Sequence, residues 1–374
     1  MNSTENLFTP PQVSRKWMDQ FLVPGLLDAR PYKIDTTSTP VKLDQNENPW
    51  DWPDHLKEKV AGALRRIPWN RYPSAYSDDL ADVVAAQAGL TPGCVLLGPG
   101  SNYLVALVMS TFSRTGQGKV VVARPSFALY ESHCAYDGIP CEPWLLDDNL
   151  QYDVRLLPAL TPGSMVVFAS PNNPVGNVLP YLALKDLATR HPNVLFVGDE
   201  AYLEYAREPY TNLLRDHSNI LLIRTFSKTL GAAGVRLGYV LGAPQLIEQL
   251  RKLRLPYMIN AFGLVAARFV LEDSEAQAHF KAVVTKGIAE RDRVFADLQT
   301  MAPQKAFKVI PSEANFLLLK WQDQSACDRA YRHILEQGIL IRDVSSGPGL
   351  AGCLRVSIGT DEQNDRFLAA IKSL

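Results

Sequence analysis

The 374-residue sequence lacks several features that would assign it to common functional classes. It has five cysteines, an odd number, and no Cys-x-x-Cys pair, so we expect reduced thiols in a cytoplasmic protein. Its 38 lysines and arginines nearly balance 39 acidic residues, which offers no electrostatic attraction to nucleic acid or an anionic membrane. No apolar stretch approaches the roughly 20 residues that span a bilayer, and the first residues lack the pattern of a secretory signal.

Familiar catalytic motifs are missing as well. The sequence has no His-Glu-x-x-His motif, no Gly-x-Ser-x-Gly elbow and no Gly-x4-Gly-Lys-Ser/Thr loop. Its six histidines are scattered singly, so we predict no metal site. The turn at Gly98 and Gly100 has Tyr103 at the third glycine position, and no acidic residue occurs from 104 to 130. These departures argue against a dinucleotide-binding turn.

What is present is an alternation of helical and strand-like segments. Apolar strands without polar alternation are expected at 95–97, 119–123, 165–168, 194–197, 220–223 and 237–240. Such strands are typical of a mostly parallel sheet that is buried by helices on both faces. The sequence therefore predicts an α/β fold.

The pattern of alternating helical and strand-like segments changes near residue 260. A long helical stretch is expected at 261–298, with a candidate break at 275–278, and strands follow at 307–310, 316–319 and 354–357. This pattern indicates a second, smaller α+β domain. We divide the chain into an N-terminal arm that also contributes to the small domain (1–44), a large domain (45–262) and a small domain (263–374).

Lys228 has the most informative surroundings. It follows the apolar run 219–223, and Ser227 and Thr229 flank it. This setting favours a lysine that forms a Schiff base with an aldehyde cofactor such as pyridoxal 5′-phosphate. Such a cofactor also needs a carboxylate at its ring nitrogen, a phosphate cradle and an aromatic face.

Four candidates for ring contacts follow three of the predicted strands. Asp199 could pair with the ring nitrogen, and the phenol of Tyr202 could reach the ring hydroxyl. The amide of Asn173 could also reach this hydroxyl, and Phe127 could cover the ring. Taken singly, these residues equally suit a strand end, a turn or a core position.

The phosphate cradle is predicted at Gly100, Ser101 and Asn102. These residues open a predicted helix, where free N–H groups and the positive end of the helix dipole attract an anion. Ser227 and Arg236 could close the cradle, although Arg236 alone would also suit a helix end on the surface.

In their order along the chain, these residues resemble the fold-type I pyridoxal-phosphate aminotransferases, and among them the histidinol-phosphate aminotransferases. The segments that carry the resemblance are 43–49 (Leu-Asp-Gln-Asn-Glu-Asn-Pro), 70–73, 100–102, 170–176, 199–202, 225–228 with Arg236, and 354–360. The resemblance implies an aspartate-aminotransferase-like fold with the cofactor in the large domain. Two positions depart from the common pattern, Tyr103 and Val175, and neither removes a catalytic group.

The resemblance also implies roles for individual residues. Lys228 would bind the cofactor and carry the proton in catalysis, Asp199 would hold the ring nitrogen, and Tyr202 and Asn173 would contact the ring hydroxyl. Phe127 would stack on the ring. The phosphate would be surrounded by Ser101, Asn102, Thr225, Ser227 and Arg236, and by Tyr72 of the neighbouring subunit, which makes a homodimer part of the prediction.

Substrate contacts are implied at Arg355, Arg342 and Tyr32. Arg355 matches the arginine that holds the acid group of the substrate, and a second arginine favours a phosphate. Arg342 would otherwise pair with Asp343 or another acid. The implied reaction is transamination of histidinol phosphate with 2-oxoglutarate, which gives imidazole acetol phosphate and glutamate in histidine biosynthesis.

Three alternatives remain open from the sequence. An aromatic amino acid aminotransferase would use the same framework, and so would a pyridoxal-phosphate-dependent decarboxylase of a phosphorylated amino acid. A non-catalytic, cofactor-binding regulatory module is the third, although every catalytic position is filled.

Overall fold

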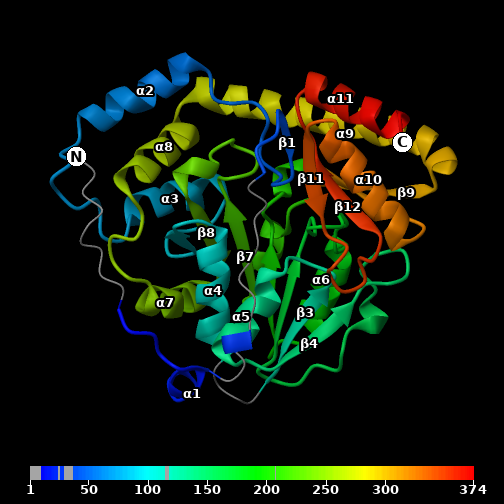
Figure 1. Cartoon of the computed structure of the whole chain (residues 1–374). Coiled ribbons are helices and arrows are strands. Elements are labelled where there is room, and N and C mark those ends of the chain that lie inside the picture. Colours follow the sequence, from blue (N-terminus) through cyan, green and yellow to red (C-terminus); the bar gives the residue numbers. More distant parts are fainter. Residues whose placement is uncertain (1–9, 24–25, 29–36, 114–117, 207) are drawn as a thin grey trace.

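Two β-sheets, each with its own hydrophobic core, organise the chain (Figure 1). The computed structural model describes residues 10–23, 26–28, 37–113, 118–206 and 208–374. The strands of the larger sheet are β2 (Val95–Gly98), β3 (Val120–Arg124), β4 (Cys141–Leu145), β5 (Met165–Ala169), β6 (Leu195–Asp199), β7 (Ile220–Thr225) and β8 (Gly238–Gly242). The strands of the smaller sheet are β1 (Val41–Leu43), β9 (Phe307–Ile310), β10 (Phe316–Trp321), β11 (Ile339–Asp343) and β12 (Cys353–Ser357).

The larger sheet has the strand order β2-β8-β7-β6-β5-β3-β4 and is mostly parallel. Only β8 pairs antiparallel with its neighbours, so the expected mostly parallel sheet is confirmed. Along β7, Leu221 and Ile223 enter the core on one face, whereas Ile220 and Leu222 enter the core on the other. Because both faces are buried, these strands have no polar alternation in the sequence.

Helices cover both faces of this sheet. One core receives side chains from α2 (Asp54–Arg65), α3 (Asp78–Gln87), α6 (Tyr181–Arg190) and α8 (Ala261–Glu272). The opposite core receives them from α4 (Ser101–Phe112), α5 (Leu129–Asp137) and α7 (Pro244–Leu253). Short 3-10 helices lie at Leu26–Asp28, Val154–Leu156, Leu203–Tyr205, Tyr210–Arg215 and Ala233–Val235. The sheet is therefore the middle layer of three.

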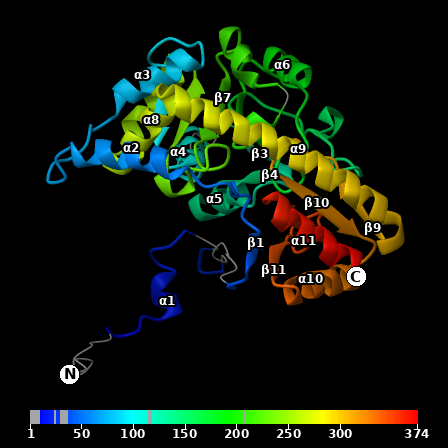
Figure 2. The same ribbon diagram turned by 90° about the horizontal axis from the view of Figure 1, so that it is seen from above.

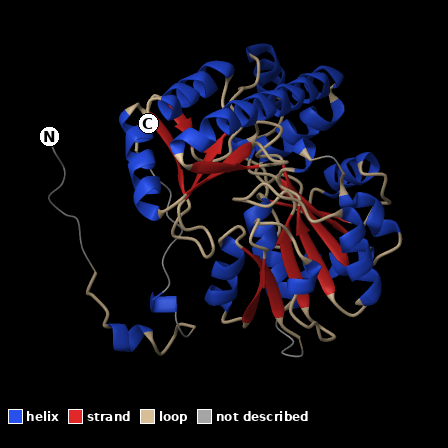
Figure 3. Cartoon of the chain, turned by 90° about the vertical axis from the view of Figure 1, so that its right-hand side faces the viewer, coloured by secondary structure: helices blue, strands red, loops and turns tan. Residues whose placement is uncertain are grey.

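The smaller sheet has the strand order β1-β11-β12-β10-β9. β1 pairs parallel with β11, so a segment before residue 44 joins strands from the end of the chain. Its core is completed by α9 (Ser274–Lys305), α10 (Gln324–Glu336) and α11 (Asp361–Lys372). Figure 3 shows the two sheets as separate groups of strands with helices on their outer sides.

The long helical stretch after residue 260 is divided earlier than the sequence indicated. The break lies at Asp273 and not at 275–278, because the Asp273 carboxylate accepts hydrogen bonds from the N–H groups of Glu275 and Ala276 and caps α9. Figure 2 shows α9 running from the larger sheet towards the smaller one. Phe280 belongs to the core of the larger sheet and Val294 to that of the smaller one. The division at residue 262 stays a prediction, and this packing favours a boundary inside α9.

The short helix α1 (Arg15–Met18) lies on an arm that projects from the rest of the protein (Figures 2 and 3). Trp17 and Phe21 on this arm are exposed and contact one another. None of the helices in the described segments combines the length and apolar character needed to cross a membrane.

Candidate active site

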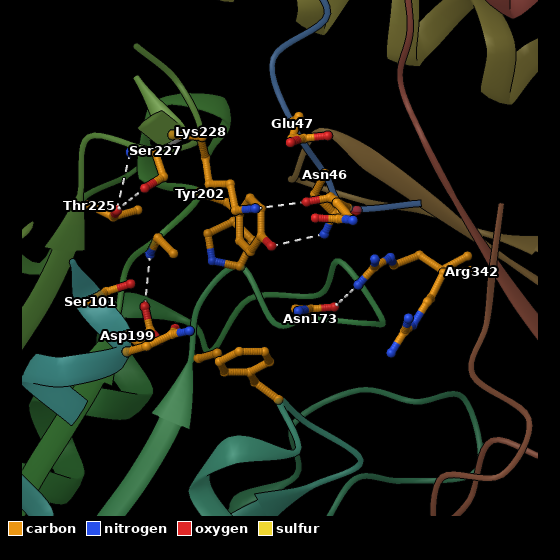
Figure 4. Close-up of a pocket in the computed structure, with 18 of the residues that line it drawn as sticks. Asn46, Glu47, Ser101, Asn173, Asp199, Tyr202, Thr225, Ser227, Lys228 and Arg342 are labelled. Carbon is orange, nitrogen blue, oxygen red and sulfur yellow. Dashed lines mark hydrogen bonds between the residues drawn. The ribbon is translucent and has the colours of Figure 1, made fainter. Parts of the chain in front are cut away.

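One cavity of about 360 Å³ collects most of the predicted site residues. It lies where β5, β6 and β7 end, the edge at which ligands gather in open α/β sheets. Figure 4 shows that its labelled side chains come from both sheets and from the segment between β1 and α2. The predicted residues that line it are Ser101, Asn102, Phe127, Asn173, Asp199, Tyr202, Thr225, Ser227, Lys228, Arg236, Arg342 and Arg355.

Asp199 is the last residue of β6, and its carboxylate is held on both oxygens. The hydroxyl of Tyr130 donates to Oδ2 over 2.7 Å, and the N–H of Ala201 donates to Oδ1 over 3.0 Å. Burial raises the pKa of Asp199 to about 6, against the lowering effect of these two donors. A positively charged ring N–H beside this carboxylate would offset its desolvation, so the position suits the ring nitrogen of the cofactor.

Lys228 follows β7, and its Nζ donates to the backbone carbonyl of Gln45 over 2.8 Å. Burial, reinforced by the positive charge of Arg355, lowers the pKa of Lys228 to about 8. A lysine with this pKa is a neutral amine far more often than an exposed lysine. It can therefore attack an aldehyde or accept a proton near neutral pH.

The predicted cradle is assembled around the first residues of α4. Gly100 precedes the helix with a φ of 93° and offers no side-chain cap, so the first N–H groups remain for an anion. A Cβ on Gly100 would lie 2.7 Å from Nη2 of Arg236. The Nη1 of Arg236 and the hydroxyl of Thr225 both donate to Oγ of Ser227, over 3.3 and 3.0 Å. Hydroxyls, helix N–H groups and one guanidinium thus converge as a phosphate requires.

The predicted ring contacts come from three loops, each of which follows a strand of the larger sheet. Phe127 lies edge-on against Tyr130, with 5.7 Å between ring centroids. The hydroxyl of Tyr202 accepts a hydrogen bond from Nδ2 of Asn46 over 2.8 Å. Oδ1 of Asn173 accepts a hydrogen bond from Arg355, so the Nδ2 end of the Asn173 amide points away from Arg355. Together with Lys228, the carboxylate and the cradle, these groups fit pyridoxal 5′-phosphate.

Arg342 and Arg355 stand directly opposite one another on β11 and β12. The side chain of Arg355 donates to Oδ1 of Asn173 and to the carbonyl of Asp44, each over 2.5 Å, and lies over the ring of Phe316. Both arginines also line a second cavity of about 170 Å³ beside the first. Two guanidinium groups therefore lie where the two cavities adjoin.

Two predicted residues are not among the described residues that line this cavity. Tyr32 lies outside the described residues. Tyr72 is 79% exposed and stacks on Tyr257, with 4.5 Å between ring centroids. Its contact with the cofactor of another subunit stays a prediction.

Several residues that contribute to the site were not predicted from the sequence. Tyr130 lies three residues after Phe127, a spacing that puts both on one face of a helical turn and could have revealed it. Asn46 lies in the segment 43–49 that carries the resemblance, but nothing local connects it to Tyr202, 156 residues away. Lys228 contacts the backbone carbonyl of Gln45, and a contact with the backbone leaves no side-chain pattern in the sequence.

Comparisons with known proteins agree with this geometry. The model of the family "Aminotransferase class I and II" matches residues 38–371. A histidinol-phosphate aminotransferase of Deinococcus radiodurans is 36% identical over 354 residues, which cover 93% of this chain and 94% of that protein. One of Methylibium petroleiphilum is 34% identical over 385 residues, covering 100% of this chain and 99% of the other.

Solved structures share the fold. Histidinol-phosphate aminotransferase from Sinorhizobium meliloti, in complex with pyridoxal-5′-phosphate, has a TM-score of 0.76 at 25% identity over 90% of this chain and 92% of that chain. An L-threonine-O-3-phosphate decarboxylase from Porphyromonas gingivalis and an aromatic aminotransferase from Pyrococcus horikoshii also reach 0.76. The decarboxylase is 22% identical over 89% of this chain and 98% of its own. The aromatic aminotransferase is 21% identical over 89% of this chain and 95% of its own. At these identities the two structures show the fold alone. The expected fold-type I architecture is confirmed.

Proposed function

The chain belongs to the class I and II aminotransferase family, whose members use pyridoxal 5′-phosphate, and we propose that it transfers the amino group of histidinol phosphate to 2-oxoglutarate. The products would be imidazole acetol phosphate and glutamate. The names of the relatives at 36% and 34% identity support this donor.

The observation that carries the choice of donor is the pair Arg342 and Arg355. Their backbones are in register on neighbouring strands, and both side chains line the cavity. A phosphate dianion can accept several charge-assisted hydrogen bonds from two guanidinium groups, whereas one arginine suffices for a carboxylate. Histidinol phosphate has a phosphate and no carboxylate, so this pair suits it better than it suits phenylalanine.

The bound cofactor would supply an aldehyde that takes up the amino group and a ring that withdraws electrons from the substrate Cα. Lys228 would hold it covalently and, once the substrate has displaced the lysine, its Nζ would remove the proton at Cα. Asp199 would keep the ring nitrogen protonated. Tyr202 and Asn173 would hold the ring hydroxyl, Phe127 would cover the ring face, and the start of α4 would bind the phosphate.

The same arginines would serve the second substrate. 2-Oxoglutarate has two carboxylates, and Arg355 would hold the one nearer its keto group, because Arg355 donates to Asn173, the residue proposed to contact the cofactor ring. Arg342 would then face the distal carboxylate. The same two arginines would thus serve both substrates.

We further propose that the protein is a homodimer in which Tyr72 completes the cofactor site of the other subunit. Tyr72 stacks on the exposed Tyr257, and the two segments that hold these tyrosines expose further aromatic and aliphatic side chains, namely Trp69, Tyr76, Leu255 and Phe262. Large exposed apolar groups of this kind are typical of protein–protein interfaces.

A donor screen tests the proposed function. The holoenzyme would be assayed with 2-oxoglutarate and either histidinol phosphate or phenylalanine, and with O-phosphothreonine alone for release of carbon dioxide. We expect kcat/KM for histidinol phosphate to exceed that for phenylalanine by at least about 100-fold, the effect of one or two charge-assisted hydrogen bonds. A preference for phenylalanine, or decarboxylation that needs no 2-oxoglutarate, would overturn the proposal.

A further inference from the structure

The segment Asp44–Glu47, between β1 and α2, enters the cavity and contacts three functional side chains in succession. The carbonyl of Asp44 accepts from Arg355, the carbonyl of Gln45 accepts from Lys228, and the amide of Asn46 donates to Tyr202. Of these contacts, only that of Asn46 uses a side chain, so only this one is specified by residue type.

Asn46 is buried, with 1% of its surface exposed, and its backbone is left-handed, with a φ of 52°. Its backbone N–H donates to Oγ of Ser357 over 2.8 Å, and its carbonyl accepts from Nδ2 of Asn315 over 3.0 Å. Asparagine tolerates this conformation better than most residues do. The backbone geometry alone would nevertheless accept glycine equally well, so it does not explain the amide side chain.

The direction of the hydrogen bond to Tyr202 follows from Ser357. Because Oγ of Ser357 accepts the backbone N–H of Asn46, its own proton goes to Oδ1 of Asn46, over 3.0 Å. The other end of the amide, Nδ2, therefore points to Tyr202 and must donate.

A phenol oxygen that accepts a hydrogen bond becomes a stronger donor through its own O–H. Tyr202 is the tyrosine proposed to contact the ring hydroxyl of the cofactor. A donor behind it would orient the phenol and strengthen the hydrogen bond that it gives to the ring oxygen. Ser357 lies two residues after Arg355 on β12, on the same face of the strand, so the support for the phenol and the substrate arginine share one element.

We propose that Asn46 is a positioning residue for Tyr202: its amide, oriented by Ser357, donates to the phenol and so strengthens the contact between Tyr202 and the ring oxygen of the cofactor. The inference rests on the proposed role of Tyr202. It does not depend on the amino donor, because the test below uses no substrate and can succeed or fail independently of the donor screen.

The test is a double-mutant cycle with Asn46→Gly, Tyr202→Phe and the double variant, each loaded with cofactor. The readout is the pH midpoint of the absorbance change of the cofactor bound to Lys228. A hydrogen bond to the ring oxygen stabilises its anion, so weakening this bond should raise the midpoint. We expect a rise of about 0.5 to 1 pH unit for Asn46→Gly, a larger rise for Tyr202→Phe, and no further rise in the double variant.

Asn48→Gly is the matched control, because this asparagine donates to the carbonyl of Thr229 and makes no contact with Tyr202 among the described hydrogen bonds. We expect its midpoint to be unchanged. If Asn46→Gly does not fold, Asn46→Asp keeps the size and left-handed backbone but lacks the donor, and should show the same rise. An unchanged midpoint in a folded Asn46 variant, or shifts that add in the double variant, would overturn the proposal.

Discussion

Tyr130 donates a hydrogen bond of 2.7 Å to Oδ2 of Asp199, and both side chains are buried at the edge of the cavity. The two residues lie 69 positions apart, on α5 and at the end of β6. The carboxylate that would hold the ring nitrogen is thus itself held by a residue on the helix that follows Phe127.

Tyr130→Phe should weaken cofactor binding about 10-fold, because an oxygen of the buried Asp199 would lose a donor, a loss of about 1–3 kcal/mol. Titration of the cofactor-free protein with pyridoxal phosphate measures this. Tyr152→Phe is the matched control, since Tyr152 is another internal tyrosine whose hydroxyl donates to the carbonyl of Ala169 over 2.6 Å. Equal losses in the two variants would contradict a specific role for Tyr130.

Asp199→Asn should stabilise the cofactor-free protein at pH 8. Burial raises the pKa of Asp199 from 3.8 to about 6, so the folded protein binds this proton more tightly than the unfolded chain does. The stabilisation that the protonated Asp199 carboxyl gives to the folded state is complete below about pH 3.8 and is lost as the pH rises through 6. Denaturant unfolding should show a gain of about 1–3 kcal/mol at pH 8 that disappears towards pH 4. A gain that is the same at both pH values would contradict this.

Lys228 should react with the cofactor at a lower pH than an ordinary lysine. Burial and Arg355 lower its pKa to about 8, and only the neutral amine above this pKa attacks the aldehyde. The rate of covalent attachment, trapped by borohydride, should therefore rise through pH 8. Arg355→Gln should move the midpoint upward, whereas Lys228→Ala should give no attachment at this position. A midpoint near 10 in the unaltered protein would refute the prediction.

Arg342→Gln should raise KM for a phosphorylated donor by about 10- to 100-fold, the loss of one or two charge-assisted hydrogen bonds. The KM of an unphosphorylated monocarboxylate donor should change less than threefold, because Arg355 would hold its carboxylate. Steady-state kinetics with both donors make the comparison. Equal changes in the two KM values would contradict a role of Arg342 in recognising the phosphate.

Mixing Tyr72→Ala with Lys228→Ala should restore activity that neither variant has. In a mixed dimer, the subunit with an intact Lys228 would receive Tyr72 from its partner and regain one complete site. Co-expression and purification of the mixed dimer with two different tags test this. If Tyr72 acts within its own subunit, or if the protein is a monomer, no activity returns.

Much of the site was predictable because its residues follow strands. Asp199 ends a buried strand, Lys228 and Ser101 each lie three residues after one, and parallel strands bring their carboxyl ends to one edge. The break before α9 was placed a few residues late, since the cap at Asp273 depends on a side chain that accepts two backbone N–H groups. Composition shows that a helix ends nearby but does not show which polar residue caps the next one.

Local patterns in the sequence are enough to predict a sheet that is buried between two layers of helices, because its strands are apolar on both faces, and to predict which residue types follow the strands. Three relationships become visible only in the folded chain: Arg342 pairs with Arg355 on the neighbouring strand, Tyr130 donates to Asp199, and Asn46 donates to Tyr202. The reason is physical. Strand burial leaves a local periodicity in the sequence, whereas register between strands and hydrogen bonds between distant residues arise only when the whole chain packs.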